Sequence, residues 1–353
     1  MKLTGLRVLD LSVFLPGPYL TLAMADHGAE VIKIEAPGEG DPGRHIGLSD
    51  GPSTVFFRNL NCGKKSIVLN LKDQTDRARL LPLSETANVL AESFRPGVAD
   101  RLGIRYDVVG VRNPRIVYCS ISAFGQEGPL RSRPAHDLAL EAESGLSSMT
   151  LGGDGKPAIP GIPVADVLAG LQGLAGVLMA LFRRTQTGVG DYIDISMHDV
   201  TVGAMLNILG RVFAEHRQPI PAHERSSGGA AFYRPYQTMD GHYLVLAGQE
   251  PKFIHNLLEA LGRPDLAGLC LRGPGPHQQP VMDFLAQGLP ADLSLNGMST
   301  WRRSTSAAEG SILCRRRLLI RTSYPEAWCS GMSWGASTLA HPSVFAMSPP
   351  PPT

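Results

Sequence analysis

The chain has 353 residues, of which 43% are hydrophobic and 18% are charged, so it can bury a sizeable core and is expected to form two domains. Its formal net charge of +1 gives no global field that would attract nucleic acid or an acidic membrane, and we expect neither as a partner. Any anionic ligand must therefore be held by local positive groups, as in a small-molecule pocket.

The cysteines and the N-terminus bear on the compartment. The five cysteines are scattered and none has CxxC spacing, which argues against a disulfide framework and against a metal site. No small-residue cleavage pattern follows a clean apolar run at the N-terminus, so we expect a cytoplasmic protein. The most apolar stretch, Val164 to Phe182, contains Asp166 and Gln172, which favours a buried helix over a membrane span.

Residues 1–130 show a series of short apolar strands. Leu6–Leu11 and Glu30–Glu35 are typical of strands, and Pro18–His27 between them is typical of a helix. This order indicates a βαβ unit with parallel strands. Further strands are predicted at Ser66–Leu71, Asn88–Ala91 and Arg115–Ser120. The pattern predicts an α/β fold with an open, doubly wound, Rossmann-like parallel sheet.

The remainder of the ordered pattern predicts the end of this large domain and a smaller one. The expected elements are a helix at Asp166–Arg184, a strand at Tyr192–Met197, a helix at Val200–Glu215, a hairpin around Met239-Asp240-Gly241 continuing into Tyr243–Ala247, and a helix at Lys252–Leu261. A Gly- and Ser-containing stretch, Glu224–Ala231, is the expected linker. We therefore predict a large domain over 1–215 and a small α+β domain over 225–288.

Residues 289–353 show neither helical nor strand periodicity. They contain Arg315-Arg316-Arg317 and the terminal prolines Pro349 to Pro352, without the Glu, Lys and Gln enrichment of disordered tails. The alternatives are a natural disordered tail and a reading-frame change in the coding sequence, and the abrupt loss of pattern favours the second.

Basic residues after the predicted strands indicate a phosphate-bearing ligand. Arg95 and Arg101 follow a strand end, where parallel sheets bind ligands, and Lys72 and the pair Lys64-Lys65 lie nearby in the sequence. The first turn, Phe14 to Tyr19, lacks the GxGxxG pattern, which disfavours a dinucleotide.

Three further positions are candidates for acid and base chemistry. They are His136 with Asp137 beside it, Asp166 at a helix start, and Glu250 before Pro251. Taken singly, Asp166 is interpreted as a helix cap, Glu250 as a first-turn residue and His136 as a loop histidine. Spacing along the chain does not show that they meet.

The order and wording of many segments together resemble family III CoA-transferases (CaiB/BaiF type) over about residues 1–285. The segments are LRVLDLS, ADHGAEVIKIE, GKKSIVLNLK, ESFRPGVADRLGI, NPRIVYCSISAFGQEGP, ADVLAGLQGLAGVLMALFRR, TGVGDYIDISMHD and DGHYLVLAGQEPKF. The resemblance implies an acyl-CoA substrate, no separate cofactor, and an interlaced homodimer.

Within that family, the chain is most similar to the α-methylacyl-CoA racemase branch. The resemblance rests on His136-Asp137, on Asp166 thirty residues after His136, and on Glu250 with Pro251 and Phe253. It implies that His136 and Asp166 exchange the α-proton of a 2-methylacyl-CoA as two bases, that Glu250 supports His136, and that amides near Asp166 stabilise the enolate. Arg101 matches an arginine that borders the CoA site in both branches.

Two alternatives remain open. The stretch GIPVADVLAG is more similar to the transferases, in which Asp166 would be a nucleophile that forms an acyl-aspartate and moves CoA between carboxylic acids. The third possibility is an inactive CoA-binding relic, disabled by its altered C-terminus.

Overall fold

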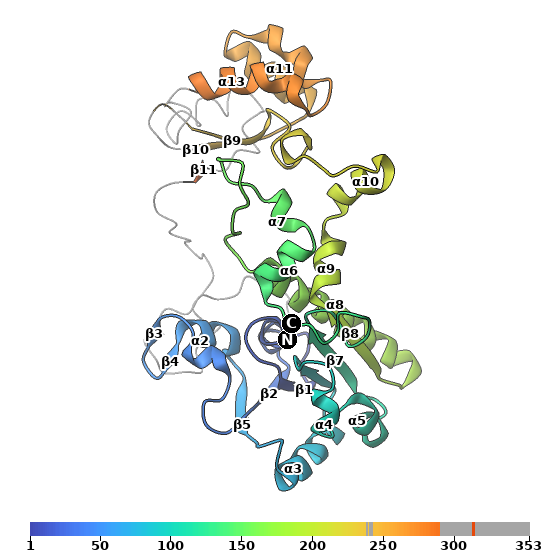
Figure 1. Cartoon of the computed structure of the whole chain (residues 1–353). Coiled ribbons are helices and arrows are strands. Elements are labelled where there is room, and N and C mark those ends of the chain that lie inside the picture. The colour runs from blue at the N-terminus through green and yellow to red at the C-terminus, as the bar shows by residue number, and fades with distance from the viewer. Residues whose placement is uncertain (238, 240–242, 290–312, 315–353) are drawn as a thin grey trace, which may run out of the picture. The chain divides into compact units, whose positions relative to one another are not determined.

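The computed structural model describes residues 1–237, 239, 243–289 and 313–314 (Figure 1). By their contacts, the described residues divide into two compact units: the first comprises Met1–Leu146 and Pro160–Ala204, and the second comprises Ser147–Ile159 and the residues from Met205 onward. Contacts do not test where an independently folding domain ends, so the boundary expected at residues 215–225 stays a prediction. The expected tail, 289–353, lies outside the described residues except for Leu289 and the two residues Leu313–Cys314.

The first unit is built on a six-stranded parallel sheet, which confirms the predicted α/β class (Figure 1). Its strands are β1 (Arg7–Leu11), β2 (Glu30–Glu35), β5 (Lys65–Val68), β6 (Val89–Glu92), β7 (Val117–Ser122) and β8 (Asp191–Ser196). The order in the sheet is β5-β2-β1-β6-β7-β8, so the chain winds outward in one direction from β1 and then in the other from β6. The carboxyl ends of β1 and β6 form the switch point at which such sheets bind ligands.

Alternation along the strands produces two apolar cores, one on each face of the sheet. Val8 packs with Leu20 of α1 (Pro16–Asp26) and Val177 of α8 (Val164–Thr187). Its neighbour Leu9 points to the opposite face, in the core that contains Leu80 of α3 (Gln74–Glu85). The same face is covered by α4 (Val98–Arg101) and α5 (Tyr106–Arg112). Because helices cover both faces, the central strands β6 and β7 are buried throughout rather than alternating between buried and exposed residues.

Helix α8 packs closely against α1 because glycines face that helix. A Cβ atom at Gly170 would lie 2.7 Å from the carbonyl oxygen of Pro16, and one at Gly173 would lie 2.8 Å from Leu20 Cδ1. The helix is long and apolar enough to cross a membrane by length and composition, with a mean hydropathy of 1.8. Its contacts with α1, β7 and β8 support the predicted interpretation as a helix of the fold.

The helix predicted at Val200–Glu215 is instead two helices, α9 (Met197–Ala204) and α10 (Leu206–Glu215). Met205 between them has φ −86° and ψ 31°, outside the helical region, and it begins the second unit. No proline or glycine stands at position 205 to mark the break. The elements without a predicted counterpart include α2 (Val55–Asn61), α6 (Asp137–Glu143), α7 (Leu146–Met149) and the short pair β3 (Ser49–Asp50) and β4 (Ser53–Thr54).

The second unit contains the predicted hairpin. Strand β9 (Tyr233–Gln237) pairs antiparallel with β10 (Tyr243–Ala247), and β10 pairs in turn with β11 (Leu313–Cys314). Pro235 lies in β9, an edge strand, where a missing backbone donor is tolerated. The core also includes side chains from α11 (Pro251–Ala260), α12 (Ala267–Cys270) and α13 (Gln279–Gly288).

Candidate active site

Asp166 lies in the first turn of α8, after Pro163 at the N-cap position. Its side chain is partly buried, and burial, together with the nearby carboxyl groups of Asp137 and Glu141, raises its pKa to about 7. In the part of the chain that the structure describes, its carboxylate makes no hydrogen bond or ion pair. Pro163, and not Asp166, is the N-cap of α8, so the interpretation of Asp166 as a helix cap is wrong. Its carboxyl group is available for chemistry.

Two carboxylates of α6 hold the start of α8. Asp137 Oδ1 accepts a hydrogen bond from the backbone amide of Asp166 at 3.1 Å, and Glu141 Oε1 accepts one from the amide of Val164 at 3.1 Å. These amides belong to the first turn, where helices leave donors without internal partners. We expected amides near Asp166 to stabilise an oxyanion. The amides of Val164 and Asp166 do not do so, because each already donates to a carboxyl oxygen of α6.

His136 directly precedes α6 and is exposed. Its ring lies edge-on to Phe14, with ring centroids 6.1 Å apart and an interplanar angle of 87°. Phe14 has φ 64°, which is rare for a residue with a side chain, in the loop between β1 and α1. The structure thus brings three predicted residues into one region: His136 precedes α6, Asp137 begins it, and Asp137 contacts the backbone of Asp166.

A buried ionic cluster anchors the loop that carries Phe14. Lys64 Nζ lies 3.0 Å from Asp10 Oδ2, and Lys33 Nζ lies 2.8 Å from Asp41 Oδ2, with all four side chains at most 1% exposed. Although burial alone would raise the pKa of Asp10, Lys64 and Lys33 hold it well below its usual value. Asp41 Oδ1 accepts from the amide of Phe14 at 3.3 Å.

This cluster corrects one expectation about phosphate binding. Lys64 is buried in the fold and cannot reach a bound phosphate, whereas its neighbour Lys65 is exposed and pairs with Glu30 at 2.7 Å. Nothing in the sequence distinguishes the two adjacent lysines, because the difference arises from packing between β1, α1 and α2.

The other predicted cations are at the expected edge of the sheet. Arg95 and Arg101 follow the carboxyl end of β6, with Arg101 ending α4, and Lys72 follows β5. All three are exposed. Among the described residues none of them forms an ion pair, so their charges are available to an anionic ligand.

Glu250 occupies the N-cap position of α11 in the second unit and is exposed, with no capping hydrogen bond from its side chain. Glu250 belongs to the second unit and His136 to the first. Its predicted support of His136 stays a prediction.

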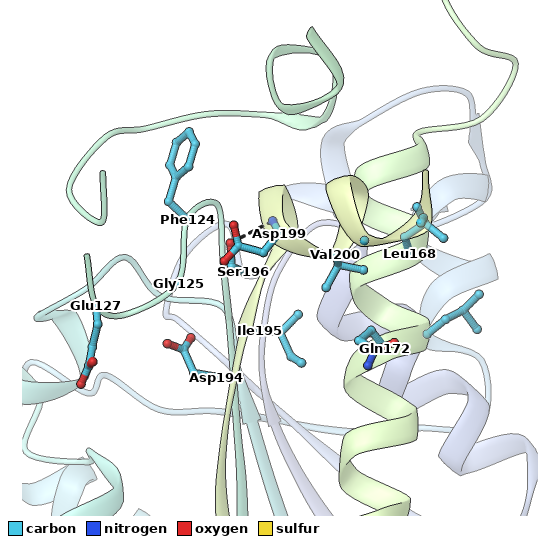
Figure 2. A pocket seen from close by; sticks show the side chains of 13 residues that line it. Phe124, Gly125, Glu127, Leu168, Gln172, Asp194, Ile195, Ser196, Asp199 and Val200 are labelled. Atoms are coloured by element: carbon cyan, nitrogen blue, oxygen red, sulfur yellow. Dashed lines mark hydrogen bonds between the residues drawn. The ribbon is translucent and has the colours of Figure 1, made fainter. Parts of the chain in front are cut away.

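A separate pocket of about 780 Å³ opens between α8, α9 and the ends of β7 and β8 (Figure 2). Figure 2 shows the carboxylates of Glu127, Asp194 and Asp199 along it, from different elements. None of the predicted site residues lines this pocket. Its acidic lining disfavours the phosphates of CoA, so we do not place the ligand there.

Sequence reasoning missed Glu141 and Phe14. Glu141 stands four residues after Asp137, a spacing that places both on one face of a helix, but no helix was predicted over 137–143. Phe14 had no signal, because a positive φ at a non-glycine residue cannot be read from a sequence.

Comparison with known proteins identifies the family. The profile of CoA-transferase family III matches residues 3–270. The chain belongs to CoA-transferase family III. An acetyl-CoA:oxalate CoA-transferase of Acetobacter aceti is 40% identical over 264 residues, which cover 74% of this chain and 67% of that protein. A succinyl-CoA:mesaconate CoA-transferase of Haloarcula marismortui is 34% identical over 277 residues, covering 75% of this chain and 68% of that protein.

The fold of this family III chain is also shared with a solved relative. A crystal structure of Rv3272 from M. tuberculosis has a TM-score of 0.73 and 30% sequence identity, covering 93% of this chain and 87% of that one. Membership implies an acyl-CoA substrate. The Acetobacter aceti and Haloarcula marismortui relatives are CoA-transferases, so the racemase branch expected from the His136-Asp137 pair gains no specific support.

Proposed function

We propose that this protein moves CoA from an acyl-CoA donor to a carboxylic acid, with Asp166 as the nucleophile. The observation that carries the proposal is the state of Asp166: a partly buried carboxyl group that makes no hydrogen bond or ion pair among the described residues and is fixed through its own backbone. A carboxylate without bonded partners keeps its lone pairs available for attack. The named relatives supply the reaction class, since both transfer CoA between acids.

The chemistry proceeds through covalent intermediates. An Asp166 oxygen attacks the thioester carbonyl and the carbon–sulfur bond breaks. This step releases the CoA thiolate and forms an acyl-aspartate anhydride. The thiolate then attacks the Asp166 carbonyl, releasing the donor acid and forming an aspartyl-CoA thioester. The acceptor carboxylate attacks the aspartyl-CoA carbonyl, which releases the thiolate and forms a second anhydride. The thiolate then attacks the acceptor's carbonyl, so that the new thioester forms and Asp166 is regenerated. No proton is gained or lost overall.

CoA requires local positive charge, because the protein has a formal net charge of only +1. We infer that Arg95, Arg101 and Lys72 bind its phosphates. They are exposed, unpaired within the described residues, and near the switch point of the sheet. In this arrangement His136 and Asp137 are positioned beside the reacting group without acting as bases.

We also infer that the chain forms a homodimer. The exposed side of α8 carries large apolar side chains: Leu178 is 39% exposed, Met179 62% and Phe182 68%. A stripe of this kind on a helix is typical of a surface that another protein covers.

The decisive experiment supplies acetyl-CoA or succinyl-CoA together with oxalate or mesaconate, and follows formation of the new thioester by chromatography. Hydroxylamine added with the donor alone should attack the activated Asp166 carbonyl, releasing the donor acid or CoA and leaving a hydroxamate on Asp166. Asp166→Asn should lower the transfer rate by at least about 10³-fold, as expected for the loss of a nucleophile. Arg101→Ala should raise KM for the thioester while leaving trapping intact at saturation. The matched control is Asp199→Asn, an exposed aspartate of α9, which should transfer CoA normally.

The racemase alternative makes the opposite prediction. In deuterated water, a 2-methylacyl-CoA would gain deuterium at its α-carbon without any acceptor acid, and hydroxylamine would trap nothing. Exchange that depends on His136, together with absent CoA transfer, would reject our proposal. Loss of both activities in a folded protein that still binds CoA would instead indicate the inactive relic.

A further inference from the structure

Glu141 carries a buried oxygen that lacks a donor. Its residue is 0% exposed, and Oε1 accepts the hydrogen bond from Val164 described above. The other oxygen, Oε2, is buried and has no hydrogen-bond donor within the part of the chain that the structure describes. An ionised carboxylate in this position would leave half of its charge without a partner, which is costly in a protein interior.

The group beside Glu141 is another carboxyl group. Asp137 lies one helical turn earlier on the same face of α6, and the two side chains accept from amides of the same turn of α8. Two neighbouring carboxyl groups can hydrogen-bond to each other only if one of them holds a proton. No ion pair to Glu141 from a lysine or arginine is found over residues 1–237, which contain α6 and the helices packed on it.

The surroundings decide which carboxyl group is protonated. Glu141 is fully buried, whereas Asp137 is only partly buried and accepts the hydrogen bond from the amide of Asp166. Burial penalises a charge, so the cost of ionisation is larger at Glu141. Burial and the nearby Asp137 raise the pKa of Glu141. The remaining charged groups do not oppose this: Asp166 on α8 is also acidic, and His198 and Asp199 on α9 hydrogen-bond to each other at 3.0 Å.

We propose that Glu141 is a positioning residue that stays protonated in the folded protein, donating from Oε2 to Asp137 while Oε1 holds the amide of Val164. The pair clamps two amides at the start of α8, and its relevance to catalysis rests on the proposed function, because that turn carries Asp166. A neutral Glu141 also leaves Asp166 facing one negative charge instead of two. A glutamine would serve equally, since its oxygen accepts and its NH₂ donates.

The first test compares thermal stability across pH. The pKa of Glu141 is higher in the folded protein than its value of 4.5 in the unfolded chain. The stability that Glu141 contributes is therefore fully present below pH 4.5. It is lost as the pH rises, because the unfolded chain ionises first. Glu141→Gln does not titrate, so its melting temperature should match wild type near pH 4.5 and exceed it increasingly toward pH 8. Glu141→Ala should melt roughly 3 °C or more below Glu141→Gln at every pH, because the Val164 amide loses its acceptor. Glu143→Gln, an exposed change on the same helix, should show no growing advantage.

The second test detects the proton directly. The infrared difference spectrum of wild type minus Glu141→Gln should contain the carbonyl stretch of a protonated carboxylic acid at pH 7, and wild type minus Glu143→Gln should contain only a carboxylate. In the trapping assay with hydroxylamine, Glu141→Gln should label Asp166 within about twofold of the wild-type rate.

A carboxylate signal from Glu141, or a Gln variant that melts below wild type at pH 8, would overturn the proposal. If wild type forms no acyl-enzyme at all, the proposed function fails, but the spectra and melting curves still decide the state of Glu141.

Discussion

At the scale of single residues, Asp166 as the proposed nucleophile meets two opposing demands. A nucleophile must be ionised, yet burial and the charge of Asp137 favour its neutral form and raise its pKa to about 7. The benefit of that environment is reactivity, since a poorly solvated carboxylate with a raised pKa is a stronger nucleophile than a hydrated one. The expected result is an enzyme whose activity titrates near neutral pH.

The pH dependence of kcat/KM tests this directly. The rate should increase with pH through an apparent pKa near 7 and then level off, because only the ionised Asp166 attacks. Asp137→Asn keeps an oxygen for the Asp166 amide but removes the charge, so the rising limb should move to lower pH by roughly one unit. Asp107→Asn, an exposed aspartate paired with Arg105, is the control and should leave the profile in place. An unchanged profile in Asp137→Asn would show that Asp137 does not set the pKa of Asp166.

The same residues show what a sequence can and cannot reveal about a site. The pairing of His136-Asp137 with Asp166 was predicted, and the structure brings Asp137 to the backbone of Asp166. The burial of Lys64 could not be predicted, because it depends on contacts with Asp10 and Pro18 from distant parts of the chain. The state of Glu141 also depends on tertiary packing, and so does the positive φ of Phe14.

At the scale of elements, the predicted strands are close to the observed ones. Glu30–Glu35 and Tyr243–Ala247 match β2 and β10, and the others differ by a few residues at their ends. Strands of a parallel sheet that is covered on both faces are short apolar runs, which are easily recognised. The division of 200–215 into α9 and α10 was missed because both helices continue the apolar periodicity across Met205.

Close packing of α1 against α8 predicts a strong effect of adding one methyl group. Gly170→Ala places a Cβ atom 2.7 Å from a backbone carbonyl oxygen, so one helix must shift, and we expect a loss of about 1–3 kcal/mol in the free energy of unfolding. Gly210→Ala in α10 is the matched control: its Cβ meets nothing within 4 Å, so it should stabilise by about 0.5–1 kcal/mol through helix propensity. Urea denaturation measures both. Equal effects of the two substitutions would mean that α1 and α8 are not in close contact.

At the scale of the whole molecule, the exposed stripe of α8 predicts the oligomeric state. A formal net charge of +1 causes little electrostatic repulsion between two copies of the chain. The exposed apolar side chains of Met179 and Phe182 would be removed from water if a second copy covered them, which favours association. Sedimentation velocity at micromolar concentration should therefore show a dimer for the full chain. Phe182→Glu should shift it to monomer, because a charge would be buried without a partner. Val111→Glu replaces a residue of α5 that is 84% exposed and should leave the dimer intact. A wild-type monomer, or a Phe182→Glu protein that remains dimeric, would show that α8 is not the interface.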